Sequence, residues 1–165
     1  YGLRMVPINQ NKPKALLTVG DKPLIERLIE QLNFVGVTDI TIVVGYMKES
    51  FDYLIDKYGV QLVYNRDYDR KNNLHSVACV LSKISNTYII PCDVYCLNNP
   101  FNKNEYYTWY MVNDLSDDNS SVSVIQNKLL SYDNNSTSGN TMIGIAFIAE
   151  KDARFMPCIL CFIFF

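Results

Sequence analysis

Side chains that suit phosphate chemistry stand at two places in the chain. Gly2 and Arg4 lie near the start, Lys14 follows a proline ten residues further on, and Asp93 comes after an apolar run. A glycine lets backbone N–H groups approach phosphate oxygens, whereas arginine offers a planar charged fork and lysine a compact point charge. A carboxylate in this company can hold Mg²⁺ between phosphate oxygens. Together they predict a site for a phosphorylated ligand, although each alone also fits an ordinary part as a turn glycine, a surface cation or a loop cap.

Helix-like and strand-like stretches alternate up to Asp93 and would position these side chains. Apolar residues at helical spacing, such as Leu24, Leu28 and Leu32, predict a helix. Helices are expected at 23–34, 48–59 and 72–84, and strands at 39–46, 60–65 and 87–93. This alternation is typical of βαβ units with a parallel sheet. Ligands bind beyond the carboxyl ends of such strands, where Gly45 and Asp93 lie.

The second half of the chain has a different pattern. Four short β-like runs are expected at 109–112, 122–125, 129–132 and 142–148, in an antiparallel or mixed arrangement. Residues 1–150 are interpreted as one domain, and residues 151–165 as an apolar tail of open origin. Cys158 and Cys161 within the tail are interpreted as two thiols in an apolar run, because no second pair of ligands accompanies them.

Composition excludes several classes of function. The net charge of −2 over 165 residues predicts no basic face for nucleic acid. No apolar run reaches the ~20 residues that a membrane span needs. The five cysteines follow no secretory signal, so a reducing cytoplasm is expected.

The opening residues, YGLRMVPINQNKPKALLTVGDKPLIERLIEQL, resemble the N-terminal signature of the nucleoside-triphosphate-dependent nucleotidyltransferases. The matching positions are Gly2, Arg4, Pro7, Pro13-Lys14, Leu16 and Lys22-Pro23-Leu24. Within that family the chain is most similar to the LicC-like CTP:phosphocholine cytidylyltransferases. The positions that carry this closer similarity are Val43-Val44-Gly45-Tyr46, Phe51-Asp52-Tyr53-Leu54, Asn72-Asn73 and Ser76.

The resemblance implies an α/β fold with a Rossmann-like, doubly wound mixed sheet. In the family a central first strand and an Ala-Ala-Gly segment come before the position of Tyr1. The chain is therefore expected to be a fragment that lacks this strand and part of the C-terminal region. By itself it is expected to be weakly folded and inactive, because neighbouring strands would lose backbone partners at a cost of ~1–3 kcal/mol each.

The function that the resemblance implies is transfer of a cytidylyl group from CTP to phosphocholine, with release of pyrophosphate. Arg4 and Lys14 would be catalytic, and Asp93 would hold Mg²⁺. The nucleotide would be bound by Gly2, Gly45, Asn72, Asn73 and Ser76. N-capping of the helix that follows is an alternative explanation for the last three of these residues.

Other residues receive weaker assignments. Tyr107 and Trp109 are candidates for cation–π contact with a trimethylammonium group, with ordinary packing as the alternative. The family's second metal-binding aspartate has no aligned counterpart, which leaves Asp133 and Asp152 by elimination. His75 is expected to be structural, and Cys92 buried and unreactive.

Two other functions compete with this reading. A sugar-1-phosphate nucleotidyltransferase would share the same loop and lysine, and a non-catalytic regulatory or binding domain could share the fold. Intact Arg4, Lys14 and Asp93 argue against the second. The parent protein could also carry a fused kinase domain.

Overall fold

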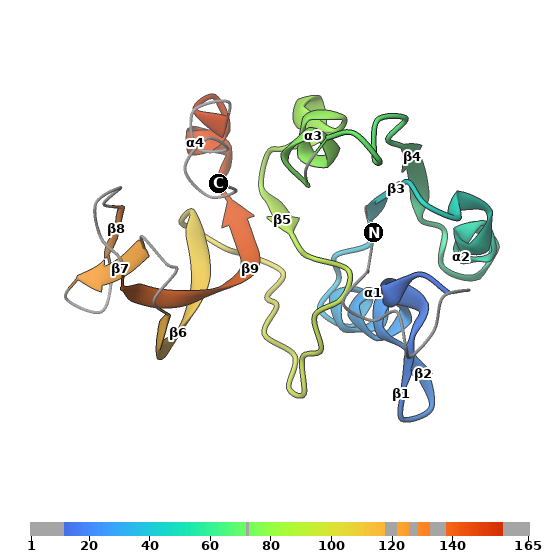
Figure 1. Cartoon of the computed structure of the whole chain (residues 1–165), viewed down its shortest axis with the longest axis horizontal. Coiled ribbons are helices and arrows are strands. Elements are labelled where there is room, and N and C mark those ends of the chain that lie inside the picture. The colour runs from blue at the N-terminus through green and yellow to red at the C-terminus, as the bar shows by residue number, and fades with distance from the viewer. Residues whose placement is uncertain (1–11, 72, 118–121, 126–128, 133–137, 157–165) are drawn as a thin grey trace. The chain divides into compact units, whose positions relative to one another are not determined.

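The computed structural model describes residues 12–71, 73–117, 122–125, 129–132 and 138–156. Gly2, Arg4 and Asn72 of the expected site lie outside the described residues, as do Asp133, Cys158 and Cys161. The chain divides into two compact units. Figure 1 labels the helices and strands. Unit 1 comprises Tyr1–Ile84 and Cys92–Glu105, and unit 2 comprises Ser85–Pro91 and Tyr106–Phe165.

Unit 1 is built around a parallel pair of strands. β3 (Thr41–Val44) pairs with β4 (Gln61–Tyr64), with Thr41 opposite Gln61 and Val44 opposite Tyr64. The chain between them forms the 3₁₀ helix η3 (Lys48–Phe51) and α2 (Tyr53–Tyr58), so the connection is the expected βαβ unit. Gly59 ends α2 with a φ of 69°, which confirms the predicted stop.

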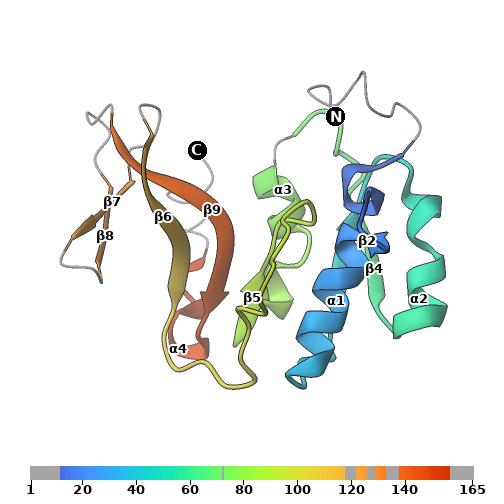
Figure 2. The ribbon, with the colours of Figure 1, turned by 90° about the horizontal axis from the view of Figure 1, so that it is seen from below.

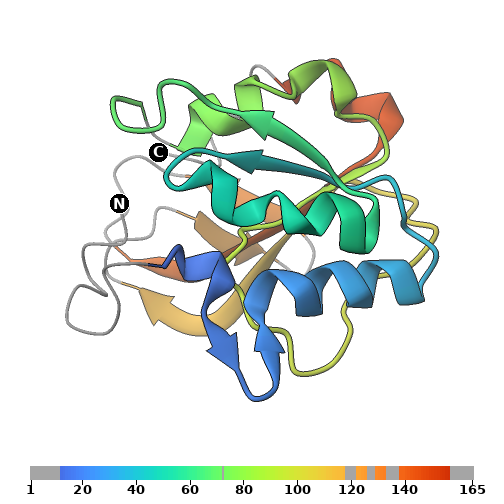
Figure 3. The same cartoon turned by 90° about the vertical axis from the view of Figure 1, so that its right-hand side faces the viewer.

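The N-terminal part of unit 1 leads into its longest helix. The 3₁₀ helix η2 (Lys14–Leu16) precedes a two-residue antiparallel ladder between β1 (Thr18–Val19) and β2 (Lys22–Pro23), and α1 (Leu24–Phe34) follows at once. Figure 3 shows α1 and α2 running side by side. The apolar face of α1 is buried as predicted and consists of Leu24, Ile25, Leu28, Ile29 and Leu32. The core that joins these elements contains Ala15, Leu16, Ile25, Ile29, Val44, Phe51, Leu54 and Val60.

Unit 2 is antiparallel, as the second half of the sequence predicts. β9 (Gly139–Ile148) lies between β5 (Thr87–Ile89) and β6 (Trp109–Asp117), and it is antiparallel to both. Figure 2 shows β6 and β9 as long, curved strands. β7 (Val122–Ile125) and β8 (Leu129–Tyr132) form a separate antiparallel pair, and α4 (Glu150–Ala153) follows β9.

Several expected helices and strands have different bounds in the structure, and two of these differences bear on the candidate site. The helix expected at 72–84 is divided into α3 (Asn73–Ala78) and the 3₁₀ helix η4 (Leu81–Lys83), because Val80 leaves helical geometry at φ −123° and ψ 15°. The strand expected at 87–93 ends at Ile89. Pro91 has no N–H to donate to a ladder, and the chain turns at Cys92 and Asp93.

The described part of the chain contains no helix with the length and apolar character needed to cross a bilayer.

Candidate functional site

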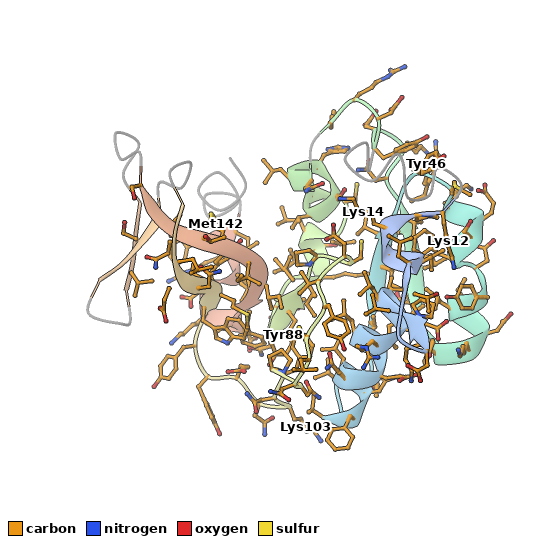
Figure 4. The ribbon with its side chains drawn as sticks, turned by 60° about the horizontal axis from the view of Figure 1, so that its bottom comes forward. Lys12, Lys14, Tyr46, Tyr88, Lys103 and Met142 are labelled. Atoms are coloured by element: carbon orange, nitrogen blue, oxygen red, sulfur yellow. The ribbon has the colours of Figure 1, made fainter. Side chains whose placement is uncertain are left out.

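Lys14 and Asp93 come together in unit 1 although 79 positions separate them in the sequence. Their Nζ and Oδ2 atoms are 3.6 Å apart. Pro13, with φ −58° and ψ 144°, precedes the short helix that carries Lys14, whereas Asp93 lies in the turn beyond β5. Figure 4 places Lys14 toward the same end of unit 1 as Lys12 and Tyr46, with Lys103 toward the other end.

The Lys14–Asp93 pair remains accessible to a ligand. The side chains are 39% and 43% exposed, so water screens their attraction and the pair contributes at most about 1 kcal/mol to stability. A cation and a carboxylate held together at this exposure can separate at low cost, and each can then take an oppositely charged partner. The geometry therefore suits a ligand that brings both a phosphate and a divalent cation.

Asp93 supplies a single carboxylate. The described residues contain no cluster of three or more histidine, cysteine or acidic side chains that could hold a metal ion. Mg²⁺ commonly takes one or two protein carboxylates and completes its shell with water and substrate phosphates. Asp93 therefore fits a magnesium ion that arrives with a nucleotide, and it does not form an all-protein metal cage.

Cys92 is exposed, which corrects the expectation that it is buried. It lies in the turn that replaces the end of the expected strand. The residue as a whole has an exposed surface, but the surrounding protein atoms still desolvate its thiol. This desolvation, and then the neighbouring Asp93 charge, raises the pKa of the thiol to about 11. The thiol stays protonated at neutral pH, so the expected lack of nucleophilic character follows from these causes.

Gly45 is required where β3 ends. A methyl group at this position would lie 2.5 Å from the Cβ atom of Tyr68, closer than two carbon atoms can approach. The loop after β4 therefore packs directly against the backbone after β3. This packing explains why position 45 holds a glycine. The expected contact of Gly45 with a nucleotide stays a prediction.

The first residues of α3 are joined to the end of β4. Asn73 begins α3 and is exposed, whereas Ser76 is half-buried. The Ser76 Oγ atom accepts a hydrogen bond of 3.0 Å from Nδ2 of Asn65. The Oδ1 atom of Asn65 accepts a second bond, also 3.0 Å long, from the backbone N–H of Asp67. Asn65 is only 2% exposed, and sequence reasoning assigned it no role.

Charged side chains surround the start of α3. The Oδ2 atom of Asp67 lies 3.2 Å from Nε2 of His75 and 3.5 Å from Nζ of Lys71. The Asp67 carboxylate is thus a partner within the protein for His75, which is half-buried. An open depression of about 580 Å³ lies beside these groups, and its lining is Arg70, Lys71, Leu74, His75 and Ala78.

The two candidate acceptor-binding aromatics, both in unit 2, have different neighbours. Trp109 packs edge-to-face on Tyr88, with ring centroids 6.0 Å apart. Tyr107 is 71% exposed and lies before β6 begins, so strand alternation does not extend to it. The Nζ atom of Lys151 lies 4.8 Å from the centroid of its ring. Asp152, a candidate metal ligand by elimination, accepts a 2.6 Å hydrogen bond from Thr108.

Comparison with known proteins places these residues in a family context. The model of the MobA-like NTP transferase domain matches residues 1–104. A choline-phosphate cytidylyltransferase of Streptococcus pneumoniae is 49% identical over 100 residues, which cover 61% of this chain and 44% of that protein. A 2-aminoethylphosphonate cytidylyltransferase of Lancefieldella rimae is 40% identical over 96 residues, which cover 56% of this chain and 39% of that protein. The match thus spans less than half the length of either relative.

A solved structure agrees with the fold. The CTP:phosphocholine cytidylyltransferase LicC of Streptococcus pneumoniae superposes with a TM-score of 0.81 and 34% sequence identity, over 94% of this chain and 69% of that one. The expected mixed α/β nucleotidyltransferase fold is thereby confirmed.

Proposed function

Because this chain belongs to the MobA-like NTP transferase domain family, we propose that the full-length protein transfers a cytidylyl group from CTP to phosphocholine and releases pyrophosphate. The observation that carries the proposal is the approach of Lys14 to Asp93, at 3.6 Å. Lys14 lies within the residues matched by the family model, and so does Asp93. The names of the similar cytidylyltransferases support CTP as the nucleotide and a phosphorylated or phosphonylated amine as the acceptor.

The proposed reaction asks little covalent chemistry of the protein. An acceptor phosphate oxygen attacks the α-phosphorus of CTP in line and forms a new P–O bond. The bond from that phosphorus to the bridging oxygen breaks, and pyrophosphate leaves with the electron pair. The acceptor phosphate is already ionised, so no catalytic base is needed. Catalysis then consists of positioning and of neutralising phosphate charge.

Lys14 and Asp93 divide that task by their charges. The ammonium of Lys14 contacts the anionic oxygens of the reacting phosphates, where it offsets charge that builds up in the transition state. The carboxylate of Asp93 would hold Mg²⁺, and the bound ion would supply positive charge that screens the phosphates and favours departure of pyrophosphate. Gly2, Arg4 and Asn72 lie outside the described residues. Arg4 keeps the catalytic role that the sequence motif predicts. The proposed nucleotide-binding residues remain Gly2, Gly45, Asn72, Asn73 and Ser76.

The acceptor's trimethylammonium group is proposed to contact Tyr107 and Trp109. The exposed ring of Tyr107 already has an ammonium over its face, that of Lys151 at 4.8 Å. A ring that accepts one cation in this way offers the electrostatic environment that a choline group needs. We further place the reaction in the cytoplasm, where the cysteines of the chain would stay reduced, and propose a fused kinase domain as one source of phosphorylated acceptor.

The test is a direct assay of transfer. The purified full-length protein is incubated with Mg²⁺, phosphocholine and each of the four nucleoside triphosphates, and pyrophosphate and nucleotidylated product are measured. The 165-residue chain by itself, which the resemblance predicts to be inactive, is assayed beside it. CDP-choline formed from CTP at the highest kcat/KM is the expected result. Glucose 1-phosphate is the competing acceptor, and transfer to it without transfer to phosphocholine would assign the chain to the sugar nucleotidyltransferases instead.

A further inference from the structure

We propose that Asn65 is a positioning residue that fixes the direction of the Ser76 hydrogen bond, so that the Ser76 hydroxyl donates to the bound nucleotide. This inference rests on the proposed function, because it concerns how the same site holds CTP. In this proposal Asn65 does not contact the substrate itself and acts only through the side chain of Ser76.

A backbone hydrogen bond holds Asn65 in place at the end of β4. β3 and β4 are parallel, and their carboxyl ends meet at the same edge. The backbone N–H of Asn65 donates to the carbonyl of Val44 at 2.9 Å, which extends the ladder by one bond past Tyr64. The side chain is then 2% exposed, and a buried amide must satisfy its hydrogen-bonding groups within the protein.

The orientation of the Asn65 amide is determined by its neighbours. The N–H of Asp67 can only donate, so the amide atom that faces it is the oxygen, Oδ1. The amide nitrogen must then face Ser76, at 3.0 Å. Because an amide NH₂ can only donate, Ser76 Oγ is the acceptor in this bond.

This direction leaves the single hydroxyl hydrogen of Ser76 directed elsewhere. A serine hydroxyl that accepts one bond can still donate one. Ser76 is half-buried on α3, three positions after the exposed Asn73, so the two share a helix face. A nucleotide bound at this helix face would therefore meet a hydroxyl donor at Ser76. The matching ligand chemistry is an acceptor, such as a pyrimidine carbonyl oxygen, a ribose oxygen or a phosphate oxygen.

The same amide also holds the loop between β4 and α3. Its bond to Asp67 closes a short turn of the Asx type. Asp67 in turn contacts His75 and Lys71, at 3.2 and 3.5 Å. Loss of Asn65 would thus release Ser76 and loosen the turn, and a test must separate the two effects.

The Asn65→Asp variant separates these two effects. It keeps the side-chain oxygen that accepts the hydrogen bond from the N–H of Asp67, but it replaces the NH₂ group that donates to Ser76 by a second oxygen, which can only accept. Ser76 would then donate inward, to the new carboxylate. We expect KM for CTP and the Kd of Mg·CTP to rise about tenfold, the size of one lost hydrogen bond, with kcat changed less. Ser76→Ala should give a similar rise. The double variant should be no weaker than Ser76→Ala alone, because the two changes remove one interaction.

Asn99→Asp is the matched control. Asn99, which is exposed, makes a comparable pair of bonds elsewhere in unit 1. Its Oδ1 accepts from the N–H of Phe101 at 3.0 Å, and its Nδ2 donates to the backbone carbonyl of Gln31 at 2.7 Å. That variant should alter thermal stability and leave the affinity for CTP within twofold.

The two single variants and the double variant form a double-mutant cycle, and each of its outcomes either supports or contradicts the inference. Additive effects of Asn65→Asp and Ser76→Ala on KM, or a fall in melting temperature with unchanged KM, would overturn it while leaving the proposed function intact. A wild-type protein that binds no nucleoside triphosphate would overturn both. If circular dichroism shows that the buried carboxylate prevents folding, the cycle is completed with the uncharged Asn65→Ala, for which the same non-additivity is expected.

Discussion

At the scale of single residues, loss of the Lys14–Asp93 pair is predicted to change the stability of the protein little and its catalytic rate strongly. The pair is about 40% exposed on each side, so its loss should cost at most about 1 kcal/mol of unfolding free energy. Lys14→Ala and Asp93→Ala should nevertheless each lower kcat by at least ~10²-fold, which is typical when one preorganised charge-stabilising group is removed. The measurement is pyrophosphate release at saturating CTP, together with thermal unfolding of each variant.

Lys12→Ala is the control for that prediction. Lys12 is an exposed lysine two positions away. It should retain kcat within about twofold, whereas Lys14→Ala should not. Equal losses in the two lysine variants would indicate a diffuse electrostatic effect and would count against a specific role for Lys14.

Sequence reasoning identified Lys14 and Asp93, which the structure brings together, but it assigned no role to Asn65, which we propose as a positioning residue. Lys14 and Asp93 carry types and contexts that indicate phosphate and metal chemistry without any coordinates. Asn65 gave only a weak signal, an asparagine directly after a strand with a residue two positions on that could close a turn. Its second partner, Ser76, lies eleven positions away, and only the fold shows that they meet.

At the scale of secondary-structure elements, α1 and α2 are joined by a buried carboxylate network. Glu26 is 5% exposed. It accepts hydrogen bonds of 2.8 Å from Tyr53, 2.7 Å from Lys57 and 2.9 Å from Tyr58. The Tyr58 oxygen also lies 2.9 Å from Glu30, so its single hydroxyl hydrogen is shared between the two carboxylates. Glu30 in addition accepts a 2.6 Å bond from Lys22. Desolvation, and then hydrogen bonding to these carboxylates, raises the pKa of both tyrosines well above the ordinary value.

The network predicts a loss of stability in acid. Burial alone would raise the pKa of Glu26, but the bonds from Lys57 and the tyrosines outweigh it and lower that pKa below 4.5. The Lys22 bond chiefly lowers the pKa of Glu30. Carboxylates with a lowered folded-state pKa stabilise the protein above the unfolded-state pKa, and that contribution is lost as pH falls through the folded-state value. Thermal unfolding from pH 7 to pH 3 should therefore show a fall in melting temperature that begins near pH 4.5.

Glu26→Gln tests the assignment of that fall. The variant should be less stable at pH 7 by about 1–3 kcal/mol, because it removes charge-assisted bonds, and its melting temperature should vary less with pH below 4.5. Glu49→Gln, at a carboxylate that is 74% exposed, should leave the curve unchanged. If Glu26→Gln retained the full acid-dependent fall, the network would not be its cause.

In unit 2, β9 depends on a glycine. Gly144 has a φ of 94°, and a methyl group there would lie 2.7 Å from Cγ of Pro91. Gly144→Ala should destabilise the protein by about 2–4 kcal/mol, through left-handed backbone strain and overpacking combined. Gly59→Ala, at φ 69° with nothing within 4 Å, should cost only the strain, about 1–2 kcal/mol. Denaturant unfolding compares them, and equal losses would show that Pro91 yields to the added methyl group.

The elements themselves were largely predictable, for reasons that also explain the exceptions. The spacing of Leu24, Leu28 and Leu32 is local information, and it identified α1 with its buried face. Glu26 lies on the same helix, but its partners Tyr53 and Tyr58 are 27 and 32 positions away, so its burial could not be predicted from periodicity. The expected 72–84 helix is divided at Val80, whose backbone leaves helical geometry although the apolar residues around it keep helical spacing, so periodicity alone did not predict the break.

At the scale of the whole molecule, the proposed function predicts that Mg·CTP stabilises the folded protein. A ligand that binds only the folded state adds ~2.7 kcal/mol at a concentration one hundred times its Kd. For a protein of this size the melting temperature should rise by roughly 5–10 °C. We expect CTP to give a larger rise than UTP, and both a larger rise than ATP or GTP, since the Asn73 and Ser76 side chains are proposed to bind a pyrimidine nucleotide. Lys14→Ala should reduce the rise with CTP, whereas Lys12→Ala should not. Differential scanning calorimetry at equal ligand concentrations makes the comparison, and a larger rise with a purine triphosphate than with CTP would refute the cytidylyl assignment while leaving family membership untouched.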